Sequence, residues 1–152
     1  MSGMEALYQQ VILEHAKRPH GSGLQEGAAA SSHQINPTCG DEVTVEVHLA
    51  AEGGVDAVRW TGHGCAISQA SASLLAQLVT EQKAELGHPL TTDELQTRID
   101  AFREAMRSRG TIQPDEELLG DVAALGGVSR YTARVKCAML AWVAAEDALA
   151  RS

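Results

Sequence analysis

The chain has few aromatic residues: one Phe, two Trp and two Tyr, together 3% of its 152 residues. Its hydrophobic fraction is nevertheless an ordinary 44%. The core must therefore be built mainly from Val, Leu, Ile, Met and Ala, a composition that favours closely packed helices. Because a chain of this length buries roughly two-thirds of the surface that its unfolded form exposes, we expect a single domain over residues 1–152.

Basic residues are also scarce. Twelve Lys and Arg stand against twenty Asp and Glu, and the formal net charge is -8. Binding to nucleic acid or to an anionic membrane requires an excess of cations that displace counterions. The composition therefore predicts no nucleic-acid partner and no membrane partner, and it favours a protein partner or a small ligand.

The sequence lacks long apolar segments and has little cysteine. No run is apolar enough to span a bilayer, and the first residues lack the basic stretch and apolar segment of a secretory signal. We therefore expect a cytoplasmic protein. Its three cysteines cannot all pair within one chain, and in a reducing compartment they are thiols, thiolates or metal ligands.

Local patterns predict an α+β fold with a small antiparallel three-stranded sheet packed against several helices. Alternating Val and Leu indicate strands, a 3.6-residue apolar period indicates helices, and Gly53-Gly54 indicates a hairpin turn. The expected elements are a helix over 4–17, a loose connection over 22–32, a short strand over 33–37, strands over 43–49 and 55–61, a helix after Cys65, a helix from a Thr91/Glu94 capping box through Met106, a short helix from Pro114 to Gly126-Gly127, and a helix capped by Ser129 that continues to about Ala150.

Cys39 and Asp41 follow a turn-forming Asn36-Pro37 sequence and precede a strand. Side chains at positions i and i+2 of an extended segment point to the same side. The thiol and the carboxylate can therefore reach one ion together. The alternative is a surface turn with an incidental Cys.

Cys65 follows Gly62 and Gly64 at the junction of a predicted strand and a predicted helix. Glycines let the backbone fold tightly there, and the positive end of the helix dipole stabilises a thiolate. The alternative is a buried, inert Cys. His63 and His33 lie near the two thiols in sequence and are candidate ligands, although surface or packing roles are the expected outcome for both.

Cys137 lies in the last predicted helix, where Arg130, Arg134 and Cys137 are spaced i, i+4 and i+7. This spacing places two guanidinium groups on the face that carries the thiol. A solvated helix face with a stray Cys is the alternative. Three thiolates and one carboxylate satisfy the tetrahedral coordination of zinc, although their spacing is unlike that of a zinc finger or ribbon.

Four segments resemble the SufU-type sulfur-transfer proteins within the wider group of IscU-like scaffold proteins. The segments are LYQQVILEHAKRPHGSG, NPTCGDEVTVEVHL, WTGHGCAISQASAS and LGDVAALGGVSRYTARVKCAMLAW. The resemblance implies a SufE/IscU-like fold. It also implies that Cys39, Asp41, Cys65 and Cys137 bind zinc and that Cys39 is the mobile sulfur acceptor. The implied partners are a pyridoxal-phosphate-dependent cysteine desulfurase of the SufS type and a SufBCD-type cluster scaffold.

Two departures from the IscU pattern favour the SufU branch. IscU-like proteins usually have a His before the third Cys and a Leu-Pro-Pro-Val-Lys motif, whereas this chain has Lys136 and the run Ser129–Arg134. The helical segment around residues 80–117 lies outside the four matching segments and is similar to an insertion of that branch, although it is longer here. We therefore expect zinc-dependent sulfur transfer in iron–sulfur cluster assembly, with Arg134 assisting the approach of an anionic persulfide. A [2Fe–2S] scaffold using the same ligands and a zinc-stapled interaction module without transfer chemistry are the alternatives.

Overall fold

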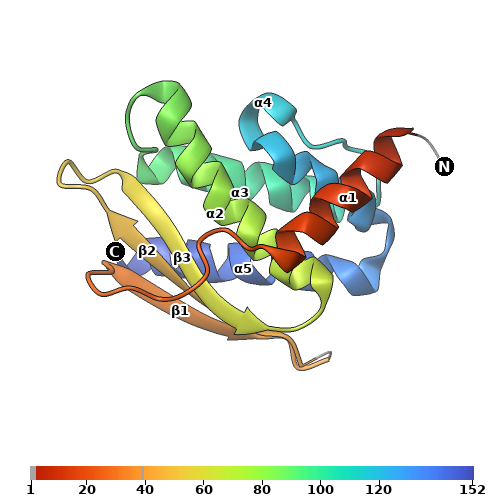
Figure 1. Cartoon of the computed structure of the whole chain (residues 1–152), viewed down its shortest axis with the longest axis horizontal. Coiled ribbons are helices and arrows are strands. Elements are labelled where there is room, and N and C mark those ends of the chain that lie inside the picture. The colour runs from red at the N-terminus through yellow and green to blue at the C-terminus, as the bar shows by residue number, and fades with distance from the viewer. Residues whose placement is uncertain (1–2, 39) are drawn as a thin grey trace.

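The computed structural model describes residues 3–38 and 40–152, with side chains described from Ala6 onward. It confirms the predicted α+β class, because a three-stranded sheet is covered by helices (Figure 1). In chain order the elements are α1 (Gly3–Lys17), β1 (Ala30–Ile35), β2 (Glu42–Leu49), β3 (Val55–His63), α2 (Ala66–Leu86), α3 (Thr92–Arg107), α4 (Glu116–Leu119), the 3-10 helix η1 (Gly120–Arg130) and α5 (Thr132–Arg151). None of the described helices is long and apolar enough to cross a membrane.

The sheet is antiparallel in the order β1-β2-β3. The predicted hairpin between β2 and β3 is confirmed, and Gly53 adopts a positive φ of 95° at its turn. Every second residue of β2 from Val43 to Val47 is buried, on the face that packs against α2 and α5 (Figure 1). The bounds expected for the first strand were wrong, because pairing with β2 already begins at Ala30 and ends before Pro37.

The core is built from small and aliphatic side chains, as the composition predicts. Helix α5 buries a row of alanines that lets it lie close to its neighbours, and its Trp142 stacks on Phe102 with ring centroids 4.3 Å apart. The indole Nε1 of Trp142 donates a hydrogen bond of 2.9 Å to Ser71 on α2. Trp142 and Phe102 therefore join α5 to α3, and Trp142 also joins α5 to α2.

The segment that precedes α5 differs from the prediction. The predicted helix that starts at Pro114 is a single turn, α4, followed by the 3-10 helix η1. Ser129 does not cap α5, because its buried hydroxyl donates to the carbonyl of Gly126 at 2.7 Å. Helix α5 begins instead at Thr132, with Tyr131 as an N-cap residue that makes no side-chain capping bond.

Candidate metal centre

Three of the four predicted metal ligands meet at one end of the molecule. Asp41 immediately precedes β2, Cys65 immediately precedes α2, and Cys137 lies in the second turn of α5. One ligand atom of each lies within 4.8 Å of the other two. Asp41 and Cys137 are each only 4% exposed, whereas Cys65 is partly accessible. The fourth predicted ligand, Cys39, lies outside the described residues.

A tight turn positions Asp41. The backbone N–H of Asn36 donates to the carbonyl of Asp41 at 2.8 Å, and the N–H of Gly40 donates back to the carbonyl of Asn36 at 2.8 Å. The side-chain oxygen of Asn36 also accepts a hydrogen bond from the N–H of Thr38. Gly40 has a positive φ of 77°, a conformation that glycine adopts without steric cost. These contacts direct the Asp41 carboxylate toward the start of α2.

Two glycines bring the Cys65 junction against Asp41. A Cβ atom on Gly64 would lie 2.5 Å from the carboxylate carbon of Asp41 and 2.8 Å from the hydroxyl of Ser68. A Cβ atom on Gly62 would overlap the carbonyl oxygen of Glu42. The Gly-x-Gly-Cys sequence therefore allows an approach that no larger side chain permits.

The start of α2 supplies favourable electrostatics for an anionic ligand. The backbone N–H of Cys65 donates to Oδ1 of Asp41 at 3.2 Å, and the Cys65 thiol lies 3.4 Å from Oδ2 of the same carboxylate. Free N–H groups and the helix dipole stabilise negative charge at this position. Both groups can therefore face one metal ion, and metal binding requires the thiol in its deprotonated form.

Of the two arginines predicted to share the helix face of Cys137, only Arg134 lies in the same helix. Helix α5 begins after Arg130, so the helical spacing does not extend to that residue, and its side chain lies instead against Gly110. Arg134 is exposed in the first turn of α5, one turn before the Cys137 thiol. The proposed assistance from Arg134 remains a prediction.

His33 and His63 are positioned by a residue that sequence reasoning missed. The Nε2 atom of His63 lies 2.6 Å from Oε1 of Glu42, and the Nε2 atom of His33 lies 3.0 Å from Oε2. Both imidazoles are exposed, as expected for surface residues, and neither belongs to the thiol cluster, the group formed by Asp41, Cys65 and Cys137. Glu42 is the residue directly opposite His63 in the strand register, which no local pattern indicates.

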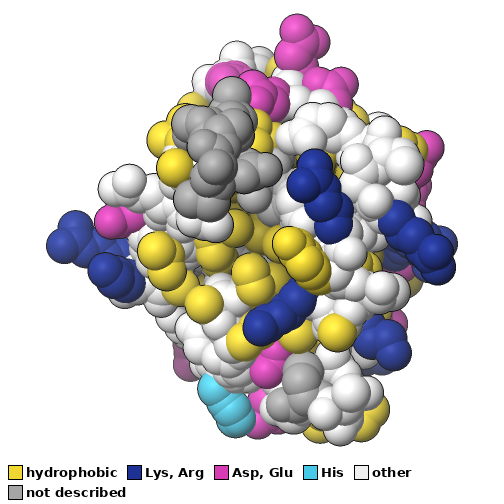
Figure 2. Space-filling model, turned by 90° about the vertical axis from the view of Figure 1, so that its right-hand side faces the viewer, with side chains coloured by type: hydrophobic (Ala, Val, Ile, Leu, Met, Phe, Trp, Pro, Cys, Tyr) yellow, Lys and Arg dark blue, Asp and Glu magenta, His cyan; other side chains and the backbone are white. Residues whose placement is uncertain are grey.

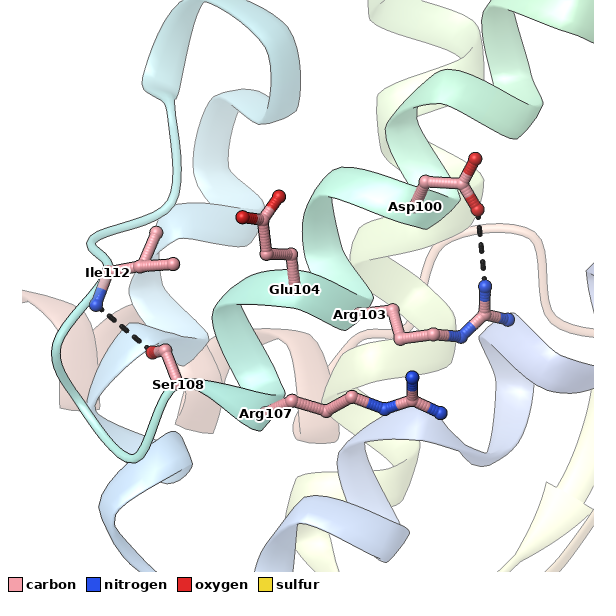
Figure 3. A pocket seen from close by; sticks show the side chains of 6 residues that line it. All are labelled: Asp100, Arg103, Glu104, Arg107, Ser108 and Ile112. Atoms are coloured by element: carbon pink, nitrogen blue, oxygen red, sulfur yellow. Dashed lines mark hydrogen bonds and ion pairs between the residues drawn. The ribbon is translucent and has the colours of Figure 1, made fainter.

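A pocket of about 410 Å³ lies elsewhere, beside the second half of α3 (Figure 3). The guanidinium group of Arg103 contacts Asp100 at 3.2 Å and Glu146 of α5 at 2.6 Å. Ser108 accepts a hydrogen bond from the backbone of Ile112 at the other end of the pocket. These interactions join α3 to α5 and to the segment that follows α3.

The fold and the clustered side chains agree with comparisons to known proteins. The model of the family described as the NifU-like N terminal domain matches residues 7–149. The chain therefore belongs to the NifU-N/IscU family, and the resemblance seen in the sequence is confirmed.

Named relatives cover nearly the whole chain. The zinc-dependent sulfurtransferase SufU of Bacillus subtilis is 35% identical over 99% of this chain and 94% of the relative. The iron–sulfur cluster assembly scaffold protein IscU of Streptococcus pyogenes is 34% identical over 100% of this chain and 88% of the relative. A crystal structure from Fervidobacterium islandicum, described as a putative scaffold protein for the SUF system, has a TM-score of 0.76, with 30% identity over 97% of this chain and 99% of that chain.

The described donor atoms fit zinc. Zinc bond lengths of about 2.0–2.3 Å in a tetrahedron separate neighbouring ligand atoms by about 3.3–3.8 Å. The three described donors, all within 4.8 Å of one another, are thus close to coordination distance. Two sulfurs and one carboxylate oxygen also match the ligand types that zinc accepts.

Proposed function

We propose that this protein is a zinc-dependent sulfur acceptor for a cysteine desulfurase in iron–sulfur cluster assembly. The observation that carries the proposal is the convergence of Asp41, Cys65 and Cys137 within 4.8 Å. Cys39 stands two residues before Asp41, a separation that limits the distance between their Cα atoms to about 7 Å. Cys39 completes the ligand set and accepts the sulfur.

The four ligands have different roles in this proposal. Bound zinc supplies positive charge that keeps the coordinating thiols deprotonated at neutral pH. Cys137 is buried and Asp41 is held by the backbone of Cys65, so these residues retain the site. The proposal assigns Cys39 as the ligand that leaves the set to accept sulfur, while the other three remain on the ion.

The transfer step is a thiol exchange without net oxidation or reduction. The Cys39 thiolate attacks the terminal sulfur of a persulfide on the partner's cysteine. A new S–S bond forms on Cys39 as the partner's S–S bond breaks, and the partner's thiolate leaves. The proton, where present on the terminal sulfur, stays with it. The product is a persulfide on Cys39 and an unmodified partner cysteine.

The end face that carries the site suits a protein partner. Figure 2 shows hydrophobic side chains gathered near the middle of this face, with Lys and Arg side chains among and beside them. Helix α1 and the start of α5 reach this end in Figure 1. Leu7 on α1 and Tyr131, which immediately precedes α5, are both exposed. An exposed apolar patch bordered by charges is typical of protein interaction sites. This surface supports docking of a pyridoxal-phosphate-dependent desulfurase, such as a SufS-type enzyme, with a SufBCD-type scaffold as the later recipient of sulfur.

Persulfide mapping tests the function. The zinc-loaded protein is incubated with desulfurase and cysteine, and intact mass and peptide mapping locate added sulfur. We expect sulfur on Cys39 and faster desulfurase turnover, both lost in Cys39→Ser. An unmodified Cys39 together with unchanged turnover would contradict the proposal.

A [2Fe–2S] scaffold is the second candidate, and the name of the Streptococcus pyogenes relative favours it. The same thiolates can hold iron. However, the exposed Lys136 occupies the position before Cys137 where IscU-like scaffolds have a His. Anaerobic reconstitution followed by absorption and Mössbauer spectroscopy separates the two functions, because a stable stoichiometric cluster supports the scaffold.

A further inference from the structure

The sheet face opposite α2 and α5 carries a second cluster of metal-binding side chains. His33 lies on β1, Glu42 on β2 and His63 on β3. Glu42 is paired directly with His63, and His33 is paired with Thr44, two residues further along β2. The alternation of β2 buries Val43 and leaves Glu42 on the open face. The register thus brings one potential ligand from each strand to the same place.

The contacts in this cluster converge on one carboxylate. The two Glu42 oxygens contact the Nε2 atoms of His63 at 2.6 Å and of His33 at 3.0 Å. The three side chains line a surface hollow of about 310 Å³, together with Thr44 and Thr61. Their exposed fractions of 50% for His33, 34% for Glu42 and 67% for His63 make them accessible to an ion from solvent.

We propose that His33, Glu42 and His63 form a second site for a divalent cation of the zinc, cobalt or nickel type. Two imidazoles and one carboxylate are a ligand set that zinc uses when it keeps an open position for water. The N···O contacts of 2.6 and 3.0 Å are shorter than the separation of about 3.3 Å between neighbouring ligands around zinc, and the three ligand atoms do not yet lie as close to one another as those of Asp41, Cys65 and Cys137 do. Because the imidazoles contact opposite oxygens, they must rotate inward to share one ion, which their exposure permits.

The second site differs chemically from the thiol cluster. It contains nitrogen and oxygen ligands only, and it lies on exposed side chains rather than in the buried junction. Its ion is therefore expected to bind more weakly and to exchange faster than an ion held by Cys65 and Cys137. The site does not depend on the proposed sulfur transfer.

Cobalt and zinc titrations of the full chain test this proposal. Equilibrium dialysis with metal analysis should give two zinc ions per chain for the native protein and one for the double variant His33→Ala, His63→Ala. The matched control is His48→Ala, because His48 pairs with Glu46 at 3.1 Å on the same sheet without a second imidazole. This control should keep both ions. Glu42→Gln, a conservative change, should also lose the second ion.

Spectra separate this proposal from the thiol-cluster assignment. Cobalt bound by Cys65 and Cys137 gives a thiolate charge-transfer band, which the double histidine variant should retain and Cys65→Ser should lose. Cobalt at the second site should remain in Cys65→Ser, without that band. A single ion in the native protein, or a second ion that survives removal of both histidines, would overturn the second site. If cobalt-loaded native protein shows no thiolate charge-transfer band, the thiol site itself is refuted.

Discussion

At the scale of single residues, Gly64 determines how closely Asp41 approaches the start of α2. An alanine Cβ would lie 2.5 Å from the Asp41 carboxylate, so the carboxylate must move. Overpacking of this kind typically costs about 1–3 kcal/mol, which corresponds to about fivefold to 150-fold in affinity.

We therefore predict that Gly64→Ala weakens zinc binding by about fivefold or more. Competition against a chromophoric chelator measures the affinity. Gly127→Ala is the matched control, because a Cβ atom there meets nothing within 4 Å. Equal zinc affinities in the two variants would show that the approach of Gly64 to Asp41 does not control the site.

His15 links α1 to α2. Its side chain is 7% exposed, and its Nδ1 atom lies 2.6 Å from the Ser73 hydroxyl. Burial, followed by the nearby His20, lowers the pKa of His15 below 6.5, and the carboxylates of Asp121 and Glu14 offset only part of that effect. The unfolded chain therefore binds a proton at this position before the folded chain does.

The sign of this shift predicts lower stability in acid. Because the folded-state pKa of His15 is depressed, its contribution to the free energy of unfolding is complete above 6.5 and is lost as the pH falls toward the folded-state value. Urea unfolding should show that the free energy of unfolding falls more steeply with decreasing pH in the native protein than in His15→Gln. His88→Gln, at an exposed position, should follow the native curve. Parallel curves for the native protein and His15→Gln would contradict the assignment.

At the scale of the element, α3 shows how local sequence specifies a helix end. Thr91 accepts a hydrogen bond from the backbone of Glu94, and the Glu94 side chain accepts one from the backbone of Thr91, each at 3.0 Å. This reciprocal pair confirms the predicted capping box. By contrast, the 3-10 geometry of η1 follows from burial of its apolar residues against α1, α2 and α5, and the sequence spacing did not predict it.

We predict that Thr91→Ala lowers the free energy of unfolding by about 1 kcal/mol. The variant loses the hydroxyl that accepts the N–H of Glu94, and that donor then depends on water. Urea denaturation measures the change. Thr92→Ala, one residue further along and also exposed, removes a hydroxyl without removing the cap and should have a smaller effect. Zinc affinity should be unchanged in both variants.

At the scale of the whole molecule, the thiol cluster connects segments that are far apart in sequence. Asp41 immediately precedes β2, Cys65 immediately precedes α2 and Cys137 lies in α5. The unfolded chain does not hold these groups together, so metal binding favours the folded state. The free energy of unfolding increases by about 2.7 kcal/mol when free zinc is a hundredfold above its dissociation constant.

We predict that zinc raises the thermal midpoint of the native protein and that a chelator reverses the increase. Cys137→Ser should remove most of the zinc-dependent part of the change, because it removes the ligand supplied by α5 to the tighter of the two proposed sites. Differential scanning calorimetry at fixed protein concentration measures both effects. The same midpoint with and without zinc would argue that no ion bridges the three segments.

The sequence by itself determined the features that depend on neighbours a few residues away. These include the alternation of β2, the glycine hairpin, the capping box of α3 and the donor types at Cys39, Asp41, Cys65 and Cys137. Only the tertiary structure decided that Asp41, Cys65 and Cys137 meet, that Arg130 precedes α5, and that Glu42 contacts two histidines. The physical reason is that these outcomes depend on strand register and on packing between distant segments, which no local spacing specifies.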